Sequence, residues 1–457
     1  MKPSRRFNEA RSRFQLPLPL GEGRGEGQRR MNKPYPHSSA HAHPDPEDKG
    51  ATALAIAMAG LVSLAVAMGI GRFAFTPLLP MMLSDGVVDL PAASWLASAN
   101  YLGYLVGAML CTLQPWLSAR FKWLPLLAYS SLVRAGLVAT GVLTLAMAWP
   151  FPQAWPLLRF AAGVTSAVVF VYTSGWCLSH LAKLGVPALG GIIYAGPGAG
   201  IVVSGLFASA MVAWHWSAAT GWLIFGVLAF VLTGAVWRIL RGDERLVARV
   251  PRLVSGGPEL GAAPLQHGHA EMTLLTLAYG LAGFGYIITA TFLPVIARAA
   301  LPSSAWLDLF WPIFGLGVMV GALLATRIPP GKDFRLLLAA CYFSQALGIA
   351  ASLWSPSLAG FVVGSLLLGV PFTAITFFAM QEVRRLRPDN AASFMGLLTA
   401  TYGVGQILGP PLVALLLRHT GSANEGFTLS LAIAGAALLL GAALYGWLVR
   451  AYPVVRR

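Results

Sequence analysis

The sequence predicts an all-α membrane protein whose twelve transmembrane helices form two pseudo-symmetric six-helix bundles. Its composition indicates lipid as the main solvent, because 56% of the 457 residues are hydrophobic and only 11% are charged, against about 25% charged in a soluble domain. The apolar runs give the number of helices, and an internal repeat gives the two bundles. The net charge of +15 indicates basic cytoplasmic loops rather than a nucleic-acid partner.

Twelve apolar runs are long enough to cross a bilayer, which takes about 20 residues in a helix. Lipid offers the backbone no hydrogen-bond partners, so runs of this length are expected to be helical. The runs cover residues 52–80, 93–117, 123–149, 154–180, 187–213, 217–239, 272–297, 304–326, 334–354, 357–380, 393–417 and 427–449.

Basic residues lie almost entirely in alternate connections between these runs, which sets the orientation by the positive-inside rule. The connections on one side contain only Arg298 and Arg418. The connections and the tail on the other side carry Arg120, Lys122, Lys183, Arg238, Arg241, Arg245, Arg249, Arg252, Arg327, Lys332, Arg335, Arg384, Arg385, Arg387, Arg450, Arg456 and Arg457. Both termini are therefore expected in the cytoplasm.

The chain is expected to divide into five parts. They are a disordered tail (1–50), an N-terminal bundle (51–240), a cytoplasmic linker (241–270), a C-terminal bundle (271–450) and a cytoplasmic tail (451–457). The first part is polar and has no apolar period, which is typical of disorder. Its segment "LPLPLGEGRGEG" resembles the translation of a repetitive intergenic element. We therefore expect Met31 to be the native start and residues 1–30 to be a wrongly assigned one.

Three sequence blocks repeat between the two halves. The matched pairs are "GIGRFAFTPLLP" (69–80) with "GFGYIITATFLP" (283–294), "GYLVGA" (103–108) with "GVMVGA" (317–322), and "GIIYAGPGAG" (191–200) with "GLLTATYGVG" (396–405). The first two pairs share one spacing, and all three fall in corresponding helices. Parallel repeats of six helices are typical of alternating-access transporters.

The region 51–450 resembles the major facilitator superfamily, and "GIGRFAFTPLLPMM" in the first helix is similar to the YbfB/YjiJ-type subgroup. The resemblance implies a multi-pass protein of the bacterial inner membrane. It also implies a central cavity lined mainly by helices 1, 4, 7 and 10. Most members of the subgroup have no assigned substrate.

The chain departs from the superfamily pattern in three places. The loop "LSARFKW" keeps the basic residues of the gating loop, Arg120 and Lys122, but lacks their acidic partner. "RFAAG" in helix 4 has Ala162 where a glutamine is common. "AGPGAG" in helix 5 carries only part of the motif associated with antiporters, which leaves the direction of transport open.

Arg72 lies just past the midpoint of the first helix. A charge at that depth costs on the order of 3 kcal/mol or more unless it faces protein or water. We expect it to point into a cavity and act as an anion clamp; the alternative is an arginine that snorkels outward or pairs with helix-end carbonyls. Gly69 and Gly71 narrow the helix here, and Pro77 and Pro80 permit a bend in its outer half.

Two further arginines lie inside apolar runs. Arg159 in helix 4 shares a face with Ser166, Phe170 and Thr173. The resemblance implies that it faces the cavity and takes part in proton or substrate coupling; the alternative is an interfacial arginine. Arg134 in helix 3 is expected to have a structural role.

The sequence shows no acidic residue at mid-membrane depth to balance these arginines. The nearest candidates are Asp308, a few residues into helix 8, and Glu382, at the cytoplasmic end of helix 10. Asp308 is a candidate proton site, and the alternative is a solvated carboxylate favoured by the helix dipole. A cavity with two arginines and no buried acid favours anionic substrates.

The remaining candidates are polar or bend-forming residues. Tyr286 is the repeat partner of Arg72, and the other possible cavity residues are Asn100, Tyr104, Thr289, Thr373, Thr376 and Gln406. Each can equally serve helix packing. The expected helix-bend residues are Gly71, Pro77, Pro80, Gly196, Pro197, Gly409 and Pro410, and Gly103-x-x-x-Gly107 and Gly317-x-x-x-Gly321 are expected to bring helices close together.

Together these features predict a monomeric secondary active transporter of a small anionic or amphipathic organic solute. We expect alternating access, proton coupling and, from the partial helix 5 motif, efflux; uptake of sugars or organic acids is the alternative. The class alternative, a membrane enzyme or a sensor on a transporter scaffold, lacks a catalytic motif or extra domain in the sequence. No metal or cofactor is expected, since Cys111, Cys177 and Cys341 all fall in apolar runs.

Overall fold

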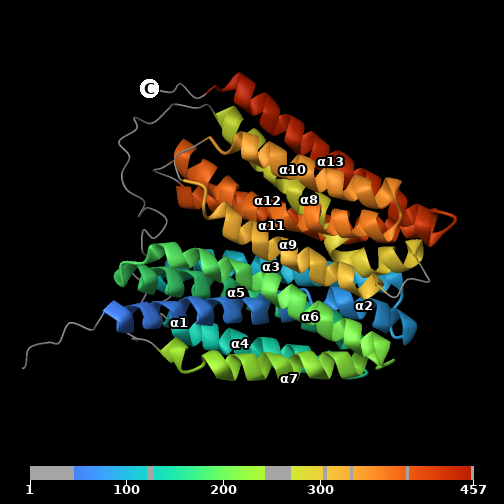
Figure 1. Ribbon diagram of the computed structural model, residues 1–457, viewed down its shortest axis with the longest axis horizontal. Coiled ribbons are helices and arrows are strands. Elements are labelled where there is room, and N and C mark those ends of the chain that lie inside the picture. Colours follow the sequence, from blue (N-terminus) through green and yellow to red (C-terminus); the bar gives the residue numbers. More distant parts are fainter. Residues whose placement is uncertain are drawn as a thin grey trace, which may run out of the picture. The chain divides into compact units, whose positions relative to one another are not determined.

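The computed structural model describes residues 46–120, 128–241, 269–301, 306–329, 333–387 and 391–453, and over these ranges the chain forms helices and no strand (Figure 1). The helices of the N-terminal half are α1 (Pro46–Leu64), η1 (Ala65–Ile70), α2 (Phe75–Ser84), α3 (Leu90–Arg120), α4 (Tyr129–Ala146), η2 (Pro152–Ala154), α5 (Trp155–Lys183), η3 (Pro187–Ala195), α6 (Gly196–Ala213), α7 (Ala218–Val236) and η4 (Ile239–Arg241). Those of the C-terminal half are α8 (His269–Ala300), η5 (Leu307–Leu309), α9 (Phe310–Ala325), α10 (Arg335–Trp354), α11 (Leu358–Leu386), α12 (Ala391–His419) and α13 (Ala423–Ala451).

Twelve helical segments among the described residues are long and apolar enough to cross a membrane, which confirms the predicted number. The first consists of α1, η1 and α2, the fifth of η3 and α6, and the eighth of η5 and α9. The α1 N-terminus and the α13 C-terminus lie at the same end of the helices (Figure 1). We call this the terminal end and the opposite one the far end.

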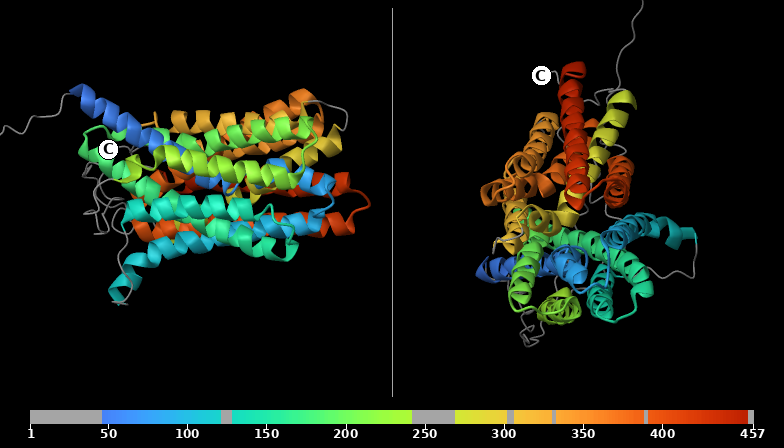
Figure 2. Two further views of the ribbon diagram at one scale, coloured as in Figure 1. Left: turned by 90° about the horizontal axis from the view of Figure 1, so that it is seen from below. Right: turned by 90° about the vertical axis from the view of Figure 1, so that its right-hand side faces the viewer.

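The two halves use the same helix pairings, as the repeat predicts. In the N-terminal half α3 packs against α5, α4 against α7, and η1 against α6. The corresponding pairs in the C-terminal half are α9 with α11, α10 with α13, and α8 with α12. The halves meet along two equivalent seams, α3 with α12 and α6 with α9, and Figure 2 shows the two groups of helices on either side.

The predicted small-residue motifs lie at close contacts between helices within each half. A Cβ atom added at Gly103 would lie 1.9 Å from the Phe160 carbonyl oxygen on α5, and one added at Gly321 would lie 1.8 Å from the Val370 carbonyl oxygen on α11. Such distances are impossible for real side chains, so glycine is required for α3 to reach α5 and for α9 to reach α11.

The first membrane-spanning segment is interrupted directly before Arg72. In η1 the backbone bonds reach five residues back, from the N–H of Gly71 to the Val66 carbonyl and from the N–H of Phe73 to the Met68 carbonyl, each at 2.9 Å. A turn over residues 71–74 then leads into α2. Of the three predicted bend residues, Gly71 lies in this turn, whereas Pro77 and Pro80 lie within α2. Pro77 is in the first turn of α2, where a missing N–H costs little.

Candidate functional site

Arg72 is buried between the two halves of the protein. Its side chain is 3% exposed, and its Nη2 donates a 2.8 Å hydrogen bond to Oε1 of Gln406 on α12. The residue therefore joins the interrupted first span to a helix of the other half. Both residues were predicted site residues, but their pairing across 334 positions was not predicted.

Aromatic rings surround the Arg72 guanidinium. Its central carbon lies 4.3 Å from the ring centre of Tyr104, 5.0 Å from that of Tyr101 and 5.2 Å from that of Phe73, within the range of cation–π attraction. Among the described residues Arg72 forms no ion pair, and its Nε has no hydrogen-bond partner. The charge is thus held by rings and one amide rather than by a carboxylate.

A stack of tyrosines continues from Gln406 into the C-terminal half. The Gln406 amide Nε2 donates to the Tyr286 hydroxyl, and the Tyr286 ring stacks on Tyr402 with centroids 5.7 Å apart. Tyr402 stacks on Tyr279 at 4.8 Å, and Phe372 meets Tyr286 edge-to-face at 4.9 Å. The repeat partners Arg72 and Tyr286 are therefore linked through one amide.

Arg159 is buried against the interruption in the first span and is only 2% exposed. Its Nη1 and Nη2 donate to the carbonyl oxygens of Gly71 and Arg72, at 3.3 and 3.0 Å. Ser166, two helical turns further along α5, donates to the Ala67 carbonyl at 2.7 Å. These donors satisfy carbonyls that a broken helix leaves open. The interfacial alternative does not describe this arginine.

Asn100 adds α3 to the same arrangement. Its side chain is fully buried, and Nδ2 donates a 2.9 Å hydrogen bond to the Arg159 carbonyl, while Oδ1 has no partner among the described residues. The absence of a side chain at Gly163 on α5 allows α3 to come this close, since a Cβ atom there would lie 2.0 Å from the Asn100 carbonyl oxygen.

A direct contact joins residues at equivalent positions of the two repeats. The Thr76 hydroxyl on α2 donates a 3.0 Å hydrogen bond to the Ala290 carbonyl on α8, 214 positions away, which is the repeat spacing. Pro294 lies inside α8 and has no N–H to bond this carbonyl. Thr76 therefore supplies, from the other half, the donor that Pro294 removes.

The other predicted polar residues lie on the C-terminal half. Thr373 Oγ1 donates a long 3.5 Å bond to the Val318 carbonyl, and Thr376 accepts a 3.0 Å bond from the Tyr279 hydroxyl. Thr289 is buried and its hydroxyl has no partner among the described residues. All three are on α8 or α11, but only Thr376 contacts the tyrosine stack directly.

Asp308 is at the far end, away from Arg72. Its carboxylate accepts a hydrogen bond from Arg298, and its carbonyl accepts one from Ser209 on α6 at 2.9 Å. The side chain is 21% exposed. The carboxylate is thus paired rather than freely solvated, and its backbone takes part in a contact between the halves.

The remaining predicted positions lie at helix ends or along the seams. Arg120 is exposed at the last residue of α3, and Lys122 lies outside the described residues. Gly196 and Pro197 mark the passage from η3 into α6, whereas Pro410 lies within α12 and Gly409 packs on Ile287. Arg134 lies over the Trp237 ring at 5.1 Å.

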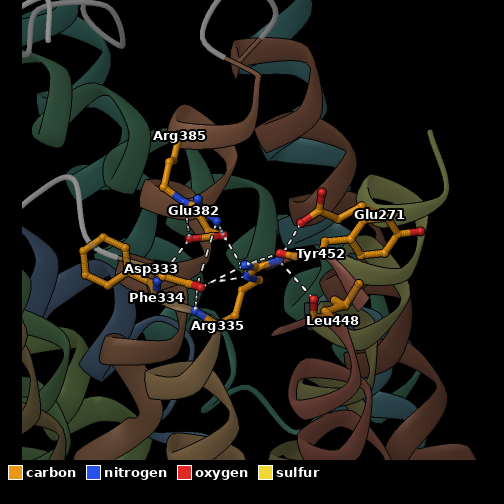
Figure 3. A network of polar contacts seen from close by, with 8 residues as sticks. All are labelled: Glu271, Asp333, Phe334, Arg335, Glu382, Arg385, Leu448 and Tyr452. Atoms are coloured by element: carbon orange, nitrogen blue, oxygen red, sulfur yellow. Dashed lines mark hydrogen bonds and ion pairs between the residues drawn. The ribbon is translucent and has the colours of Figure 1, made fainter. Parts of the chain in front are cut away.

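A second polar cluster ties together the terminal-end residues of the C-terminal half, around the fully buried Arg335 (Figure 3). Arg335 Nη1 donates to Glu271 at 2.7 Å, Nη2 donates to Asp333 at 2.8 Å, and Nε lies 3.5 Å from Glu382. Arg385 pairs with Glu382 as well. We call these five residues the carboxylate cluster.

Arg335 also holds the end of the last helix. Its Nη1 and Nη2 donate to the carbonyls of Leu448 and Tyr452, at 3.2 and 2.8 Å. Burial alone raises the pKa of Asp333, but hydrogen bonds from Arg335 and the charges of Arg335 and Arg385 outweigh it and hold that pKa below its usual value.

The carboxylate cluster corrects the sequence analysis in two respects. Arg335 was counted as a loop residue but is buried, and Glu271 was overlooked although it is fully buried too. Buried acids therefore exist, at the helix ends rather than beside Arg72. The available signal was a charged residue at the start of α8, at the start of α10 and at the end of α11.

The tyrosine stack was the other feature that the sequence analysis missed. Tyr402 precedes Gln406 by four positions in "YGVGQ", and Tyr279 precedes Tyr286 by seven, so each pair occupies one helix face. That spacing was a usable signal.

Comparisons with known proteins agree with this architecture. A family profile described as "Uncharacterised MFS-type transporter YbfB" matches residues 64–445. The uncharacterized MFS-type transporter YceJ of Bacillus subtilis (strain 168) is 25% identical over 389 residues, which cover 80% of this chain and 91% of that protein.

Solved structures show the same fold. Two crystal structures of the nucleoside transporter NupG, one of them a point mutant, match with a TM-score of 0.63 and 17% and 14% identity, covering 87% of this chain and 99% of theirs. At such identity the likeness concerns the fold alone. Since the family match runs from the first membrane-spanning segment to the twelfth, the chain is a multi-pass membrane protein that belongs to the YbfB-type family of major facilitator superfamily transporters.

Proposed function

We propose that this protein is a secondary active transporter that moves a small anionic or amphipathic organic solute by alternating access, with Arg72 as the anion clamp. The observation that carries the proposal is the burial of Arg72 between the halves without a carboxylate partner among the described residues. A buried charge that lacks an acid is expected to serve a ligand. The one bond between the halves that Arg72 forms within the described part of the chain goes to a neutral amide, which a solute can replace.

The charge around the centre supports an anionic solute. Arg159 donates to the backbone carbonyl of Arg72, so two buried arginines are in direct contact. The described carboxylates are all at helix ends, as in the carboxylate cluster and at Asp308. A cavity with this balance has a positive potential and attracts anions.

Proton coupling and efflux complete the proposal. The partial antiporter motif supports efflux. The motif begins α6, which packs against α9 at a seam between the halves. Cβ atoms added at Gly198 and Gly205 would lie 2.7 Å from the Gly315 carbonyl oxygen and 2.6 Å from Pro312 Cδ on α9. Small residues at such a seam allow the helices to slide while staying in contact.

The proposal also places the protein in the bacterial inner membrane as a monomer, with the terminal end in the cytoplasm. The support is the clustering of basic residues in alternate connections. Protease protection of a tag at the C-terminus, compared in intact cells and inverted vesicles, tests this orientation.

Transport in inside-out membrane vesicles tests the function. The solute panel contains organic acids, sugars, a nucleoside and hydrophobic drugs, each with and without an imposed proton gradient. We expect accumulation of an organic acid, driven by the gradient, and its loss in Arg72→Ala. Arg134→Ala is the matched control, since it removes an intramembrane arginine that lies against Trp237. Equal transport by Arg72→Ala and wild type would contradict the proposal.

A further inference from the structure

The hydrogen-bonding groups around Arg72 define what part of a solute can bind there. Nη2 is bonded to the neutral amide oxygen of Gln406, and Nε is open. A carboxylate oxygen placed where Gln406 Oε1 lies would form a shorter and stronger bond, because both partners would be charged. The second carboxylate oxygen could accept from the open Nε. The guanidinium therefore presents a two-point site for one carboxylate.

Arg159 does not present a second such site. Both of its terminal nitrogens are bonded to the carbonyls of Gly71 and Arg72. The Arg159 Nε also has no partner among the described residues, but with both terminal nitrogens bonded to backbone carbonyls it offers one point and not two. One two-point guanidinium fits a single carboxylate better than a dianion such as a dicarboxylate.

The side chains that a solute meets beside this guanidinium are mainly aromatic. Tyr104 from α3, and Phe372 and Tyr402 from α11 and α12, are each partly exposed, whereas Arg72 and Gln406 are 3% exposed. Tyr104 is also the ring nearest to the guanidinium. Rings from both halves thus lie around one buried positive charge.

We infer that the solute is a planar aromatic monocarboxylate, which displaces Gln406 from Arg72 and places its ring against Tyr104, Phe372 and Tyr402. This inference rests on the proposed function and specifies its substrate class. Aromatic contacts stabilise a planar ring beyond the area that it buries. Displacement of Gln406 also breaks a bond between the halves, so binding and the movement of the halves are coupled through one residue.

Binding to the purified full-length protein in detergent tests the inference. The probes are benzoate, cyclohexanecarboxylate and benzamide, titrated by saturation-transfer NMR at neutral pH. We expect benzoate to bind roughly 3- to 10-fold more tightly than cyclohexanecarboxylate, which has the charge but not the planar ring. Benzamide, which has the ring but not the charge, should bind at least about tenfold more weakly than benzoate.

Variants separate the two parts of the site. Arg72→Gln should abolish binding of both carboxylates. Arg72→Lys retains the charge but not the two-point geometry, so it should bind both carboxylates at least about tenfold more weakly than wild type. Tyr104→Leu should reduce the preference for benzoate over cyclohexanecarboxylate, because it removes the ring nearest to the guanidinium and leaves Phe372 and Tyr402 in place. Tyr129→Leu is the matched control, since Tyr129 packs on Tyr172 in a similar ring pair at 5.2 Å, away from Arg72. Size-exclusion profiles and melting temperatures verify that each variant is folded.

The outcomes distinguish the inference from the function on which it rests. Equal wild-type binding of the two carboxylates, both lost in Arg72→Gln, would overturn the aromatic preference and leave the anion clamp standing. Carboxylate binding that persists in both Arg72 variants, or no carboxylate binding at all, would overturn the clamp together with the inference.

Discussion

Two arginines of this protein are buried to almost the same degree and have opposite surroundings. Arg335 is fully buried in the carboxylate cluster, within one half of the protein, and is bonded to Glu271 and Asp333. Arg72 is 3% exposed between the halves, and it contacts rings and one amide. Each guanidinium has to recover the cost of leaving water, and only Arg335 does so with charges of the protein itself.

The difference in partners separates a structural role for Arg335 from the binding role proposed for Arg72. The charges around Arg335 are balanced by its own neighbours, so its contacts stabilise the C-terminal half and leave no place for a ligand. The charge of Arg72 has no such partner among the described residues, and in the proposed function a bound solute balances it. Burial alone does not separate a structural arginine from a binding one, but the nature of the partners does.

The largest effect is expected from breaking the balanced site. Arg335→Leu leaves Glu271 and Glu382 buried with one cation fewer, which should destabilise the protein by about 3 to 5 kcal/mol. Thermal and denaturant unfolding in detergent measure this. Arg450→Leu, at an exposed position in the last turn of α13, is the control and should change stability by less than about 0.5 kcal/mol. Equal effects of the two variants would show that the carboxylate cluster does not stabilise the protein.

Arg72→Ala should have the reverse pattern. In the proposed function, truncating the Arg72 charge is expected to cost about 2 to 5 kcal/mol of solute binding, that is, at least a roughly 30-fold loss of transport. Stability should fall by only about 1 to 3 kcal/mol, because the Gln406 amide rather than a carboxylate is left unpaired. Vesicle transport and unfolding of the same preparation measure both. A variant that transports normally but unfolds easily would make Arg72 a second structural arginine.

A smaller effect is expected where the halves touch through a neutral bond. Thr76→Val keeps the shape of the side chain but removes the donor to the Ala290 carbonyl, which should cost about 1 kcal/mol. Thr112→Val removes a hydroxyl that bonds only within its own helix, to Ala108, and should be nearly silent. The difference between the two unfolding midpoints gives the strength of the contact.

The smallest effect concerns pH. The pKa of Asp333 is lowered in the folded protein, so its stabilising contribution is complete above the unfolded value of about 4 and is lost as pH falls through the folded value. Acid unfolding of wild type and Asp333→Asn should therefore differ most at neutral pH and converge below about pH 4. Parallel curves over this range would show that the Asp333 charge contributes nothing.

Much of the fold could be predicted from the sequence because lipid allows few alternatives. Apolar length predicted the number of helices, and the repeat predicted two equivalent bundles, which use matching pairs such as α3 with α5 and α9 with α11. Arg72 could be predicted as a candidate because a lone charge is conspicuous in an apolar run. The sequence could not show that Gln406 is its partner, since that bond depends on how α12 crosses the first span.

Arg335 shows why charge counting misassigns residues near a membrane boundary. Arg335 is the first residue of α10, so in the sequence it cannot be distinguished from the loop residues that precede it. Its burial depends on Glu271 and Tyr452, which come from two other helices. The bend in the first span lies at Gly71 and not at the two prolines for a similar reason, because Arg159 from α5 bonds the carbonyls of Gly71 and Arg72 in that turn.

The contacts of Arg159 also limit how the protein can move. Through Asn100, Arg159 and Ser166, helices α3 and α5 are bonded to each other and to the interrupted first span. A movement that keeps these bonds therefore carries the three segments together as one rigid body. Spin labels on α3 and α5 would keep a constant separation through the transport cycle, while a pair on α5 and α11 would report the full displacement.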